Sequence, residues 1–153
     1  MNELLDRIAR MPRFLSDAIE SADPEDAPVP GTEDGFSLRE QACHLRDLER
    51  EGYHVRVRRI LAEDVPDLAG FDGGTIAKER NYRAQDGRAA ARDFAAARAE
   101  LVATLSRATP EQLAREATLF GKRITLADLV AMIDEHDQGH RAEIEALAAM
   151  QSH

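Results

Sequence analysis

Hydrophobic residues recur at intervals of three or four along this chain, the spacing that places them on one side of an amphipathic helix. The first such stretch runs from about Asn2 to Glu20, and Pro12 within it predicts a bend or an interruption. Its apolar positions are Leu4, Leu5, Ile8, Phe14, Leu15, Ala18 and Ile19. The segment that follows, residues 21–35, is rich in proline and glycine and predicts a loop.

A second helix is predicted to begin at Ser37. Ser37 and Glu40 have the spacing of a capping box, in which each side chain binds the backbone amide of the other residue. The pattern then continues to about Glu63, with apolar positions Leu38, Leu45, Leu48, Val55 and Leu61. Pro66 and the glycines over residues 70–74 predict the next break.

A third helix, rich in alanine, is predicted from about Ala77 to Ala108. A short helical turn follows it, with Thr109 as the N-cap and Pro110 in the first helical position. The sequence ATLFGKRITL then predicts an extended segment with a turn at Gly121-Lys122.

The last helix is predicted from a second capping signal, Thr125 with Asp128, to about Met150. The chain contains no repeat, no low-complexity tract and no sign of a second domain. Four long helices in a chain of this length therefore predict an all-α fold, an antiparallel four-helix bundle formed by one domain over residues 1–153.

Composition and charge narrow the class of protein. Hydrophobic residues make up 43% and charged residues 32% of the chain, as in a folded, soluble protein. The net charge of -9 argues against a nucleic-acid surface, which needs a basic face. No apolar run reaches the roughly 18 residues of a membrane span, and the N-terminus lacks the apolar core of a secretory signal. The only cysteine, Cys43, fits a reducing compartment, so we expect a cytoplasmic protein.

Two histidines interrupt the apolar stripe of the last helix. His136 and His140 lie between Ile133 and Ile144, where a bundle helix normally has aliphatic residues. At i and i+4 the two rings are one turn apart on the same side, so both can reach one metal ion. The alternative is a pair of hydrogen-bonded histidines at the edge of the core. We favour the metal, because it satisfies both buried rings together.

A metal ion needs at least one further protein ligand, and His44 is the best candidate. It lies beside Leu48 on a helical wheel, at the edge of the apolar stripe of the second helix. His54 is surrounded by arginines and predicts a solvated position, and His153 is the chain terminus.

Several residues near these histidines are candidates for other roles. Glu51 and Asp47 follow His44 by two turns and one turn and are the candidate catalytic acids or bases, although solvated carboxylates are the alternative. Asp137 is a candidate for orienting a histidine or for the helix surface. Tyr82 is a candidate for the mouth of the pocket, and Cys43, which points away from His44, is predicted to be a core residue.

The second and last helices also resemble a known family. The sequences SLREQACHLRDLEREGYHVRVRRIL and TLADLVAMIDEHDQGHRAEIEAL are similar to the DinB-like superfamily, which includes the YfiT-like metal-dependent hydrolases. The resemblance implies a four-helix bundle with a divalent metal, nickel or zinc, held by His44, His136 and His140. It also implies a homodimer. The aromatic residue that commonly precedes the second-helix motif, often tryptophan, is Phe36 here, which leaves the subfamily open.

The resemblance implies an enzyme that acts on a small molecule, either a hydrolase or a transferase of low-molecular-weight thiols. Three histidines leave a coordination position open, as in catalytic metal sites. The alternative is a stress-related bundle that binds a metal or a small ligand without turnover. A zinc protease is not expected, because in His136-Asp137-Gln138-Gly139-His140 an aspartate replaces the longer catalytic glutamate of that motif.

Overall fold

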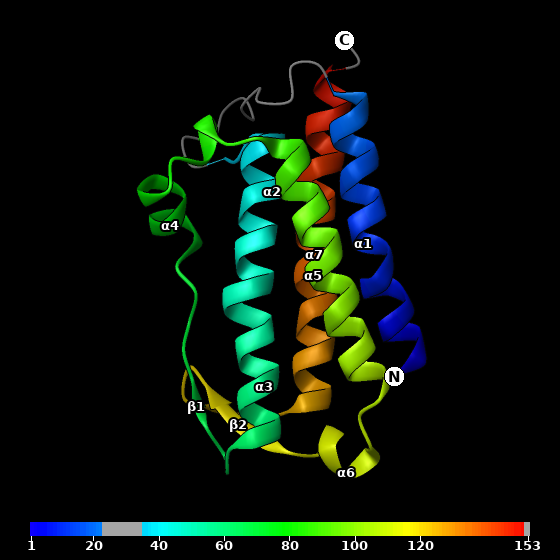
Figure 1. Ribbon diagram of the computed structural model, residues 1–153, viewed down its shortest axis with the longest axis vertical. Coiled ribbons are helices and arrows are strands. Elements are labelled where there is room, and N and C mark those ends of the chain that lie inside the picture. The colour runs from blue at the N-terminus through cyan, green and yellow to red at the C-terminus, as the bar shows by residue number, and fades with distance from the viewer. Residues whose placement is uncertain (23–34, 152–153) are drawn as a thin grey trace.

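The computed structural model describes residues 1–22 and 35–151 of the chain. Most of the loop predicted over residues 21–35 lies outside the described residues, as does His153. The rest confirms the predicted fold class. It is a mostly helical chain that forms a four-helix bundle, with a small three-stranded sheet at one end (Figure 1).

The first helix, α1, spans Asn2–Ser21 and continues through Pro12, which therefore does not interrupt it. Its fully buried hydrophobic residues are Leu5, Ile8, Met11, Leu15 and Ile19. Their spacing of three or four residues is the one that the sequence predicts, and it turns one side of α1 to the core.

The second predicted helix is continuous but has three parts. These are α2 (Leu38–Asp47), a π-helical segment η1 (Leu48–Tyr53) and α3 (His54–Ala62). Ser37 caps the start as predicted, since its hydroxyl accepts the amide of Glu40 and the Glu40 carboxylate accepts the amide of Ser37. The π-helical segment is not predicted by the sequence pattern. It takes up an additional residue, so side chains beyond it point in other directions than on a regular α-helix.

The predicted third helix over residues 77–108 is divided in the structure. Its parts are α4 (Gly73–Glu79), a 3-10 turn η2 (Tyr82–Ala84) and α5 (Gly87–Ser106). Asn81 adopts the left-handed conformation, with a φ of 49°, and separates α4 from the turn. The carboxylate of Asp86 then accepts the amides of Arg88 and Ala89 and so begins a new helix.

The remaining elements are β1 (Asp67–Leu68), α6 (Pro110–Leu113), β2 (Glu116–Leu119), β3 (Lys122–Thr125) and α7 (Leu126–Gln151). Strand β1 pairs in parallel with β2, and β2 pairs in antiparallel with β3. The β2–β3 turn is at Phe120-Gly121, one residue before the predicted place, with φ angles of 51° and 76°. The predicted caps at Thr109 and Thr125 are both present.

The four long helices do not simply alternate in direction. Helices α1 and α7 run toward one end of the bundle, whereas α2–α3 and α5 run toward the other (Figure 1). Helix α5 packs against α1 and α2, and α1 packs against α7. Because α3 and α5 run in the same direction, residues 63–86 return along the bundle between them, with β1 and α4 on the way.

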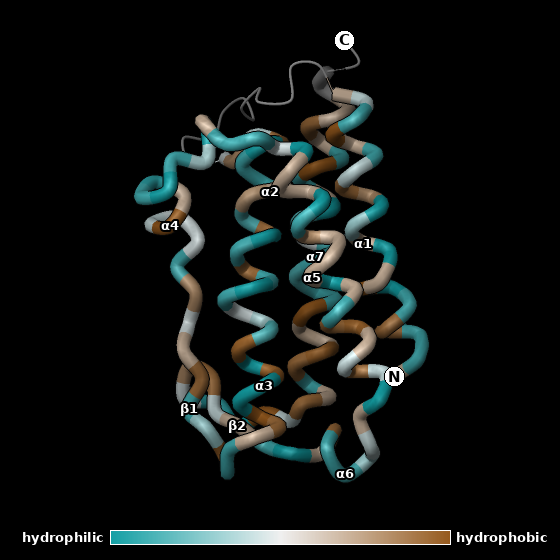
Figure 2. The backbone as a smooth tube through the Cα atoms, in the orientation of Figure 1, coloured by the Kyte–Doolittle hydropathy of each residue, from teal (hydrophilic) through white to brown (hydrophobic). Residues whose placement is uncertain are grey.

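The core has two hydrophobic halves with a polar layer between them. Hydrophobic and hydrophilic residues alternate along every long helix (Figure 2). The half toward the sheet includes Ile8, Val57, Leu101 and Ile133, and the other half includes Leu15, Leu45, Phe94 and Ile144. Along their helices, Arg98 of α5 and His136, Asp137 and His140 of α7 lie between these halves. His44 of α2 and Glu49 of η1 face them, since the ring of His44 lies 4.9 Å from that of His140 and Glu49 accepts from Arg98.

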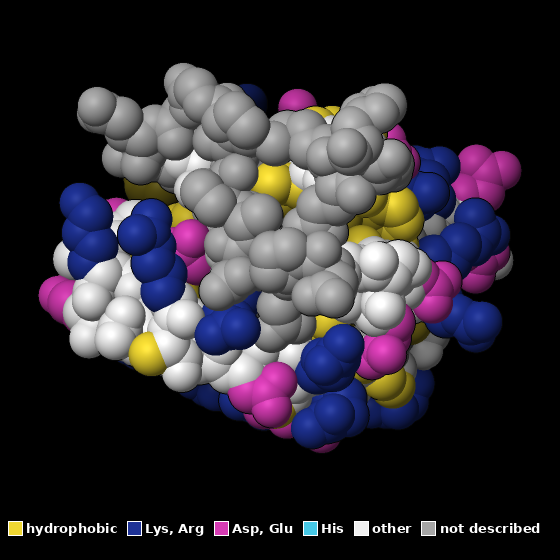
Figure 3. All heavy atoms as spheres, turned by 90° about the horizontal axis from the view of Figure 1, so that it is seen from above, with side chains coloured by type: hydrophobic (Ala, Val, Ile, Leu, Met, Phe, Trp, Pro, Cys, Tyr) yellow, Lys and Arg dark blue, Asp and Glu magenta, His cyan; other side chains and the backbone are white. Residues whose placement is uncertain are grey.

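The surface carries charges of both signs. At the end of the bundle where α7 finishes, Lys and Arg side chains are interspersed with Asp and Glu (Figure 3). In the part of the chain that the structure describes, no helix has the length and apolarity that crossing a bilayer requires.

Candidate metal centre

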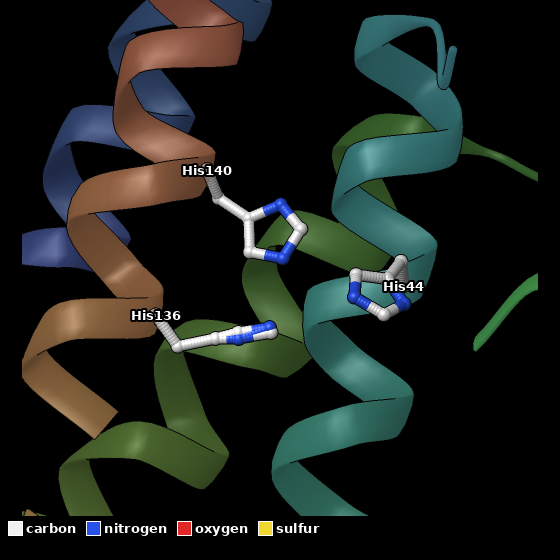
Figure 4. Close-up of side chains that lie close together, drawn as sticks. All are labelled: His44, His136 and His140. Atoms are coloured by element: carbon white, nitrogen blue, oxygen red, sulfur yellow. The ribbon is translucent and has the colours of Figure 1, made fainter. Parts of the chain in front are cut away.

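The structure brings together the three histidines that the sequence singles out. His44 comes from α2 and His136 and His140 come from α7, and the rings point toward one another across the bundle (Figure 4). One nitrogen from each ring lies within 4.8 Å of the other two. Ligands at about 2.1 Å from one tetrahedral ion are roughly 3.4 Å apart, so small ring rotations bring the three nitrogens to that spacing.

The two histidines of α7 are held side by side by the helix itself. Their rings are stacked, with centroids 4.7 Å apart and an angle of 17° between the planes. Ile133 and Ile144, which flank them in the stripe, are fully buried and fix the rotation of α7 against the core. The side chain of His140 is 12% exposed, whereas His136 is exposed, so the cluster is open to solvent on the side of His136.

The surroundings lower the pKa of all three rings and so favour their neutral form. The pKa of His44 is lowered to about 3, first by burial and then by the neighbouring His140 and His136. Burial also lowers the pKa of His136 and of His140, although their acidic neighbours Asp137 and Glu143 oppose this. A neutral imidazole has a free nitrogen lone pair, which is the form that binds a metal ion.

Gln41 and Glu143 determine which nitrogen of His140 is free. Nδ1 of His140 lies 2.9 Å from Oε1 of Gln41, and Nε2 of Gln41 donates to the Glu143 carboxylate at 2.6 Å. Because Gln41 uses its amide nitrogen on Glu143, its oxygen must accept from His140, which places the proton on Nδ1. Nε2 of His140 is then unprotonated and available to a metal, the arrangement typical of metal-binding histidines.

Gly73, at the start of α4, lies directly on the ring of His44. A Cβ atom at this position would be 2.6 Å from Cε1 and 2.8 Å from Nδ1 of His44, closer than any side chain permits. Nδ1 therefore faces the α4 backbone and is buried without a hydrogen-bond partner among the described residues. Nε2 is the nitrogen on the side away from Gly73, toward the other two histidines.

Aromatic rings form the walls around the cluster. Phe36 lies 5.3 Å and Phe71 6.1 Å from the ring of His44, and Tyr53 lies 6.4 Å from the ring of His136, all measured between centroids. Three neutral nitrogens in an apolar surrounding, open on one side, fit a divalent metal ion with a free coordination position.

Comparison with known proteins places the chain in a family. The family model of the DinB superfamily matches residues 3–144, which is nearly the whole sequence. The chain belongs to the DinB superfamily. A solved structure of YfiT from Bacillus subtilis, described as a probable metal-dependent hydrolase with an unusual four-helix bundle topology, has the same fold as this DinB-superfamily chain. The TM-score is 0.88 at 19% sequence identity, over 99% of this chain and 87% of that one. No curated protein matches the chain.

The two candidate acids or bases of this DinB-superfamily chain are both paired with arginines. Asp47 is 4% exposed and accepts hydrogen bonds from Arg46, Arg80 and Tyr82. Burial alone would raise the pKa of Asp47, but these hydrogen bonds outweigh it and lower the pKa. Glu51 is exposed to solvent and accepts a hydrogen bond from Arg80. This hydrogen bond lowers the pKa of Glu51. Glu51 lies within the π-helical segment, so it does not share with His44 the line that a regular helix predicts.

Other residues named from the sequence occupy clear positions. Cys43 is fully buried in the core, as predicted. Tyr82 is also buried and lines a cavity of about 630 Å³ next to Phe36, while its hydroxyl donates to Asp47. His54 is not on a solvated face, because it is half-buried and Nε2 lies 2.8 Å from the carbonyl oxygen of Ala97.

Among the described residues, Asp137 makes no hydrogen bond to a histidine but belongs to a buried ion cluster. The guanidinium of Arg98, 1% exposed, donates to Glu49, to Asp137 and to the carbonyl oxygen of Ile8. This cluster connects α1, η1, α5 and α7 directly beside His136. The sequence pattern does not indicate it, because Arg98 lies in an alanine-rich helix like several exposed arginines, and its partners Glu49 and Asp137 are distant in the sequence.

Proposed function

We propose that this chain is an enzyme that binds one divalent metal ion, nickel or zinc, through His44, His136 and His140 and hydrolyses a small molecule. The observation that carries the proposal is the cluster itself: three neutral imidazoles from two helices, with one nitrogen each within 4.8 Å. The description of YfiT as a probable metal-dependent hydrolase supports the same class of activity.

The residues of the chain prepare the site for such an ion. A bound divalent ion supplies a Lewis acid and lowers the pKa of a water molecule in its open position toward 7. Gln41 fixes the tautomer of His140, and the backbone of Gly73 packs on the Nδ1 side of the His44 ring. The rings of Phe36, Phe71 and Tyr53 exclude water from most of the surroundings, and the exposed side at His136 admits a substrate. An open side of this kind favours turnover over a closed structural site.

The ligand assignment is tested by elemental analysis of protein purified without a histidine tag. We expect about one nickel or zinc ion per chain in the wild type and loss of the ion in His44→Ala and in His140→Ala. His54→Gln is the matched control, because His54 lies outside the cluster and should leave the metal content unchanged. If His140→Ala retains the wild-type stoichiometry, the proposed site is wrong. The proposal also fails if the wild type binds no divalent ion after reconstitution.

The reaction class is tested separately with the metal-loaded protein. We expect hydrolysis of small esters or amides that requires the metal and no added thiol. Activity that appears only with a low-molecular-weight thiol would make the chain a thiol transferase instead. Full metal content without turnover in either screen would favour the non-catalytic metal-binding bundle.

A further inference from the structure

Arg56 is a buried cation without a carboxylate. Arg56 is 9% exposed, yet no Asp or Glu of the described chain lies within 4.0 Å of its guanidinium. The other deeply buried arginine, Arg98, binds two carboxylates. Removing a guanidinium from water is costly unless an anion compensates the charge, so the absence of a partner for Arg56 calls for an explanation.

The hydrogen bonds of Arg56 use only part of its guanidinium. Nε and Nη2 both donate to the carbonyl oxygen of Ala69, at 3.3 and 3.2 Å. Nη1 has no partner among the described residues, and it is not among the atoms that are sealed from solvent. Two N–H groups on Nη1 are therefore available to something that enters the site.

Arg56 is next to the histidine cluster. Its guanidinium carbon lies 6.0 Å from the centre of the Tyr53 ring, and that ring lies 6.4 Å from the ring of His136. Its positive charge contributes to the low pKa of His136, which also places it near that ring. The ring of Tyr53 therefore lies near both the ring of His136 and the guanidinium of Arg56.

The π-helical segment accounts for this position. On a regular α-helix, Arg56 would lie about 120° around the axis from His44. The additional residue in η1 reduces the rotation about the helix axis between the two residues by about 100°. Arg56 therefore lies within about 20° of His44 around that axis. Single π-helical turns within α-helices are frequent at functional sites, where they change the direction of side chains in this way.

Tyr53, whose ring centre lies 6.0 Å from the guanidinium carbon of Arg56, offers a second donor. It is 5% exposed, and its hydroxyl has no hydrogen-bond partner among the described residues and retains contact with solvent. Burial raises the pKa of the phenol, so the hydroxyl stays protonated and can donate. A guanidinium N–H and a phenol O–H are both donors that a carboxylate accepts, and the two oxygens of one carboxylate can take one from each.

We propose that Arg56 and Tyr53 form an anion subsite beside the metal centre, and that the substrate of this enzyme carries a carboxylate which binds there. The subsite rests on the proposed function in one respect only, which is that the reacting bond of the same molecule lies at the metal. The competing explanation is that Arg56 serves only to cap the Ala69 carbonyl and to pack on Tyr53. That explanation predicts no preference for anionic ligands.

The test compares an acid with its neutral amide on cobalt-loaded protein. The probes are 3-mercaptopropionate and 3-mercaptopropionamide, with mercaptoacetate as a shorter acid, and the thiolate-to-cobalt absorption band reports binding. We expect the wild type to bind at least one acid about tenfold more tightly than the amide, as a charge-assisted hydrogen bond allows. In Arg56→Gln the preference should vanish, and in Arg56→Lys part of it should remain. Arg58→Gln, an exposed arginine on the same helix, is the matched control and should bind like the wild type.

Equal preference for the acid in Arg56→Gln and in the wild type would overturn the proposal, and so would a wild type that binds acids and amide alike. If Arg56→Gln does not fold, Tyr53→Phe decides, because it removes one donor and keeps the ring. We expect its preference to fall about threefold or more, and an unchanged preference counts against the subsite.

Failure of the metal site is recognised separately. If no cobalt binds, the proposed function fails, and the metal-free protein is titrated with propionate while the amide signals of residues 53–56 are followed by NMR. Saturable shifts in the wild type and in Arg58→Gln but not in Arg56→Gln support the subsite. Shifts that are absent, or that are the same in all three proteins, overturn it.

Discussion

His44 shows how the surroundings of a residue favour its proposed use as a metal ligand. It is 7% exposed and lies between the rings of Phe36 and Phe71 and the backbone of Gly73. None of these neighbours stabilises an imidazolium, so the ring is neutral far below the pH at which histidine usually takes up a proton. A ring that stays neutral keeps its nitrogen available to a metal ion in mildly acidic solution.

The same low pKa couples the stability of the metal-free protein to pH. Because the pKa of His44 is about 3 in the folded chain and 6.5 for a free histidine side chain, the unfolded chain binds more protons between these values. The free energy of unfolding should therefore fall as the pH drops below 6.5, by about 1.4 kcal/mol for this residue between pH 7.5 and 5.5. This is measured by urea unfolding of chelator-treated wild type and His44→Gln at both pH values. Between them, the free energy of unfolding of the variant should fall by about 1.4 kcal/mol less than that of the wild type. Identical pH dependence in the two proteins would show that His44 is not responsible.

Gln41 is the residue whose removal should weaken metal binding without removing a ligand. Its oxygen holds Nδ1 of His140, so Gln41→Leu frees the ring to rotate and to change tautomer. We expect the affinity for zinc to fall about 10- to 100-fold in competition with a chromophoric chelator. Gln41→Glu keeps an acceptor oxygen and should bind more tightly than Gln41→Leu. Wild-type affinity in Gln41→Leu would contradict this role.

At the scale of the elements, the bundle is held in register by a polar layer as well as by its two apolar halves. The guanidinium of Arg98 on α5 contacts Glu49 of η1, Asp137 of α7 and the backbone of α1. Burial raises the pKa of both Glu49 and Asp137, while their charges raise the pKa of Arg98, so the cluster depends on all three members. Asp137 directly follows His136, so the cluster also fixes the turn of α7 that carries the histidine.

Loss of Arg98 should therefore destabilise the protein strongly. Arg98→Met leaves two buried carboxylates without a cation, and we expect the free energy of unfolding to fall by about 3–5 kcal/mol. Urea unfolding at pH 7 measures the change, with the exposed Arg92→Met on the same helix as the control. Replacing Glu49 and Asp137 by leucine in the Arg98→Met background should recover part of the loss. A change below about 1 kcal/mol in Arg98→Met would show that the cluster is not a stabilising unit.

At the scale of the whole molecule, a metal bound between α2 and α7 joins two helices whose direct packing is slight compared with that of α1 on α5. An ion that binds only the folded state stabilises it by mass action. At a free metal concentration 100-fold above the dissociation constant the gain is about 2.7 kcal/mol. For a chain of this size we expect the Tm to rise by about 5–10 °C in calorimetry. In His44→Ala the Tm should not respond to the same addition of metal.

Local sequence signals predict much of this structure and part of its site. The capping residues at Ser37, Thr109 and Thr125 mark helix starts that the structure confirms. The pair His136 and His140 is conspicuous because it breaks an otherwise aliphatic stripe, and helical geometry then requires the two rings to be neighbours.

What the sequence does not predict depends on departures from regular geometry or on distant pairings. The π-helical segment has no composition of its own, so a regular helical wheel places Arg56 and Tyr53 wrongly. Gln41 reaches His140 only through the packing of α2 beside α7. The break at Asn81 depends on a left-handed residue inside a sequence of good helix formers, which propensity alone assigns to one long helix.

The return segment between α3 and α5 also affects the order in which the bundle can assemble during synthesis. Because a ribosome releases the chain from its N-terminus, α1, α2 and α5 can assemble while α7 is still to be made. Synthesis of the chain from His44 to His136 and His140 takes on the order of ten seconds. Until α7 is made, only one of the three histidines of the cluster is present and the core is incomplete. The proposed three-histidine site can therefore form only after α7 has been synthesised.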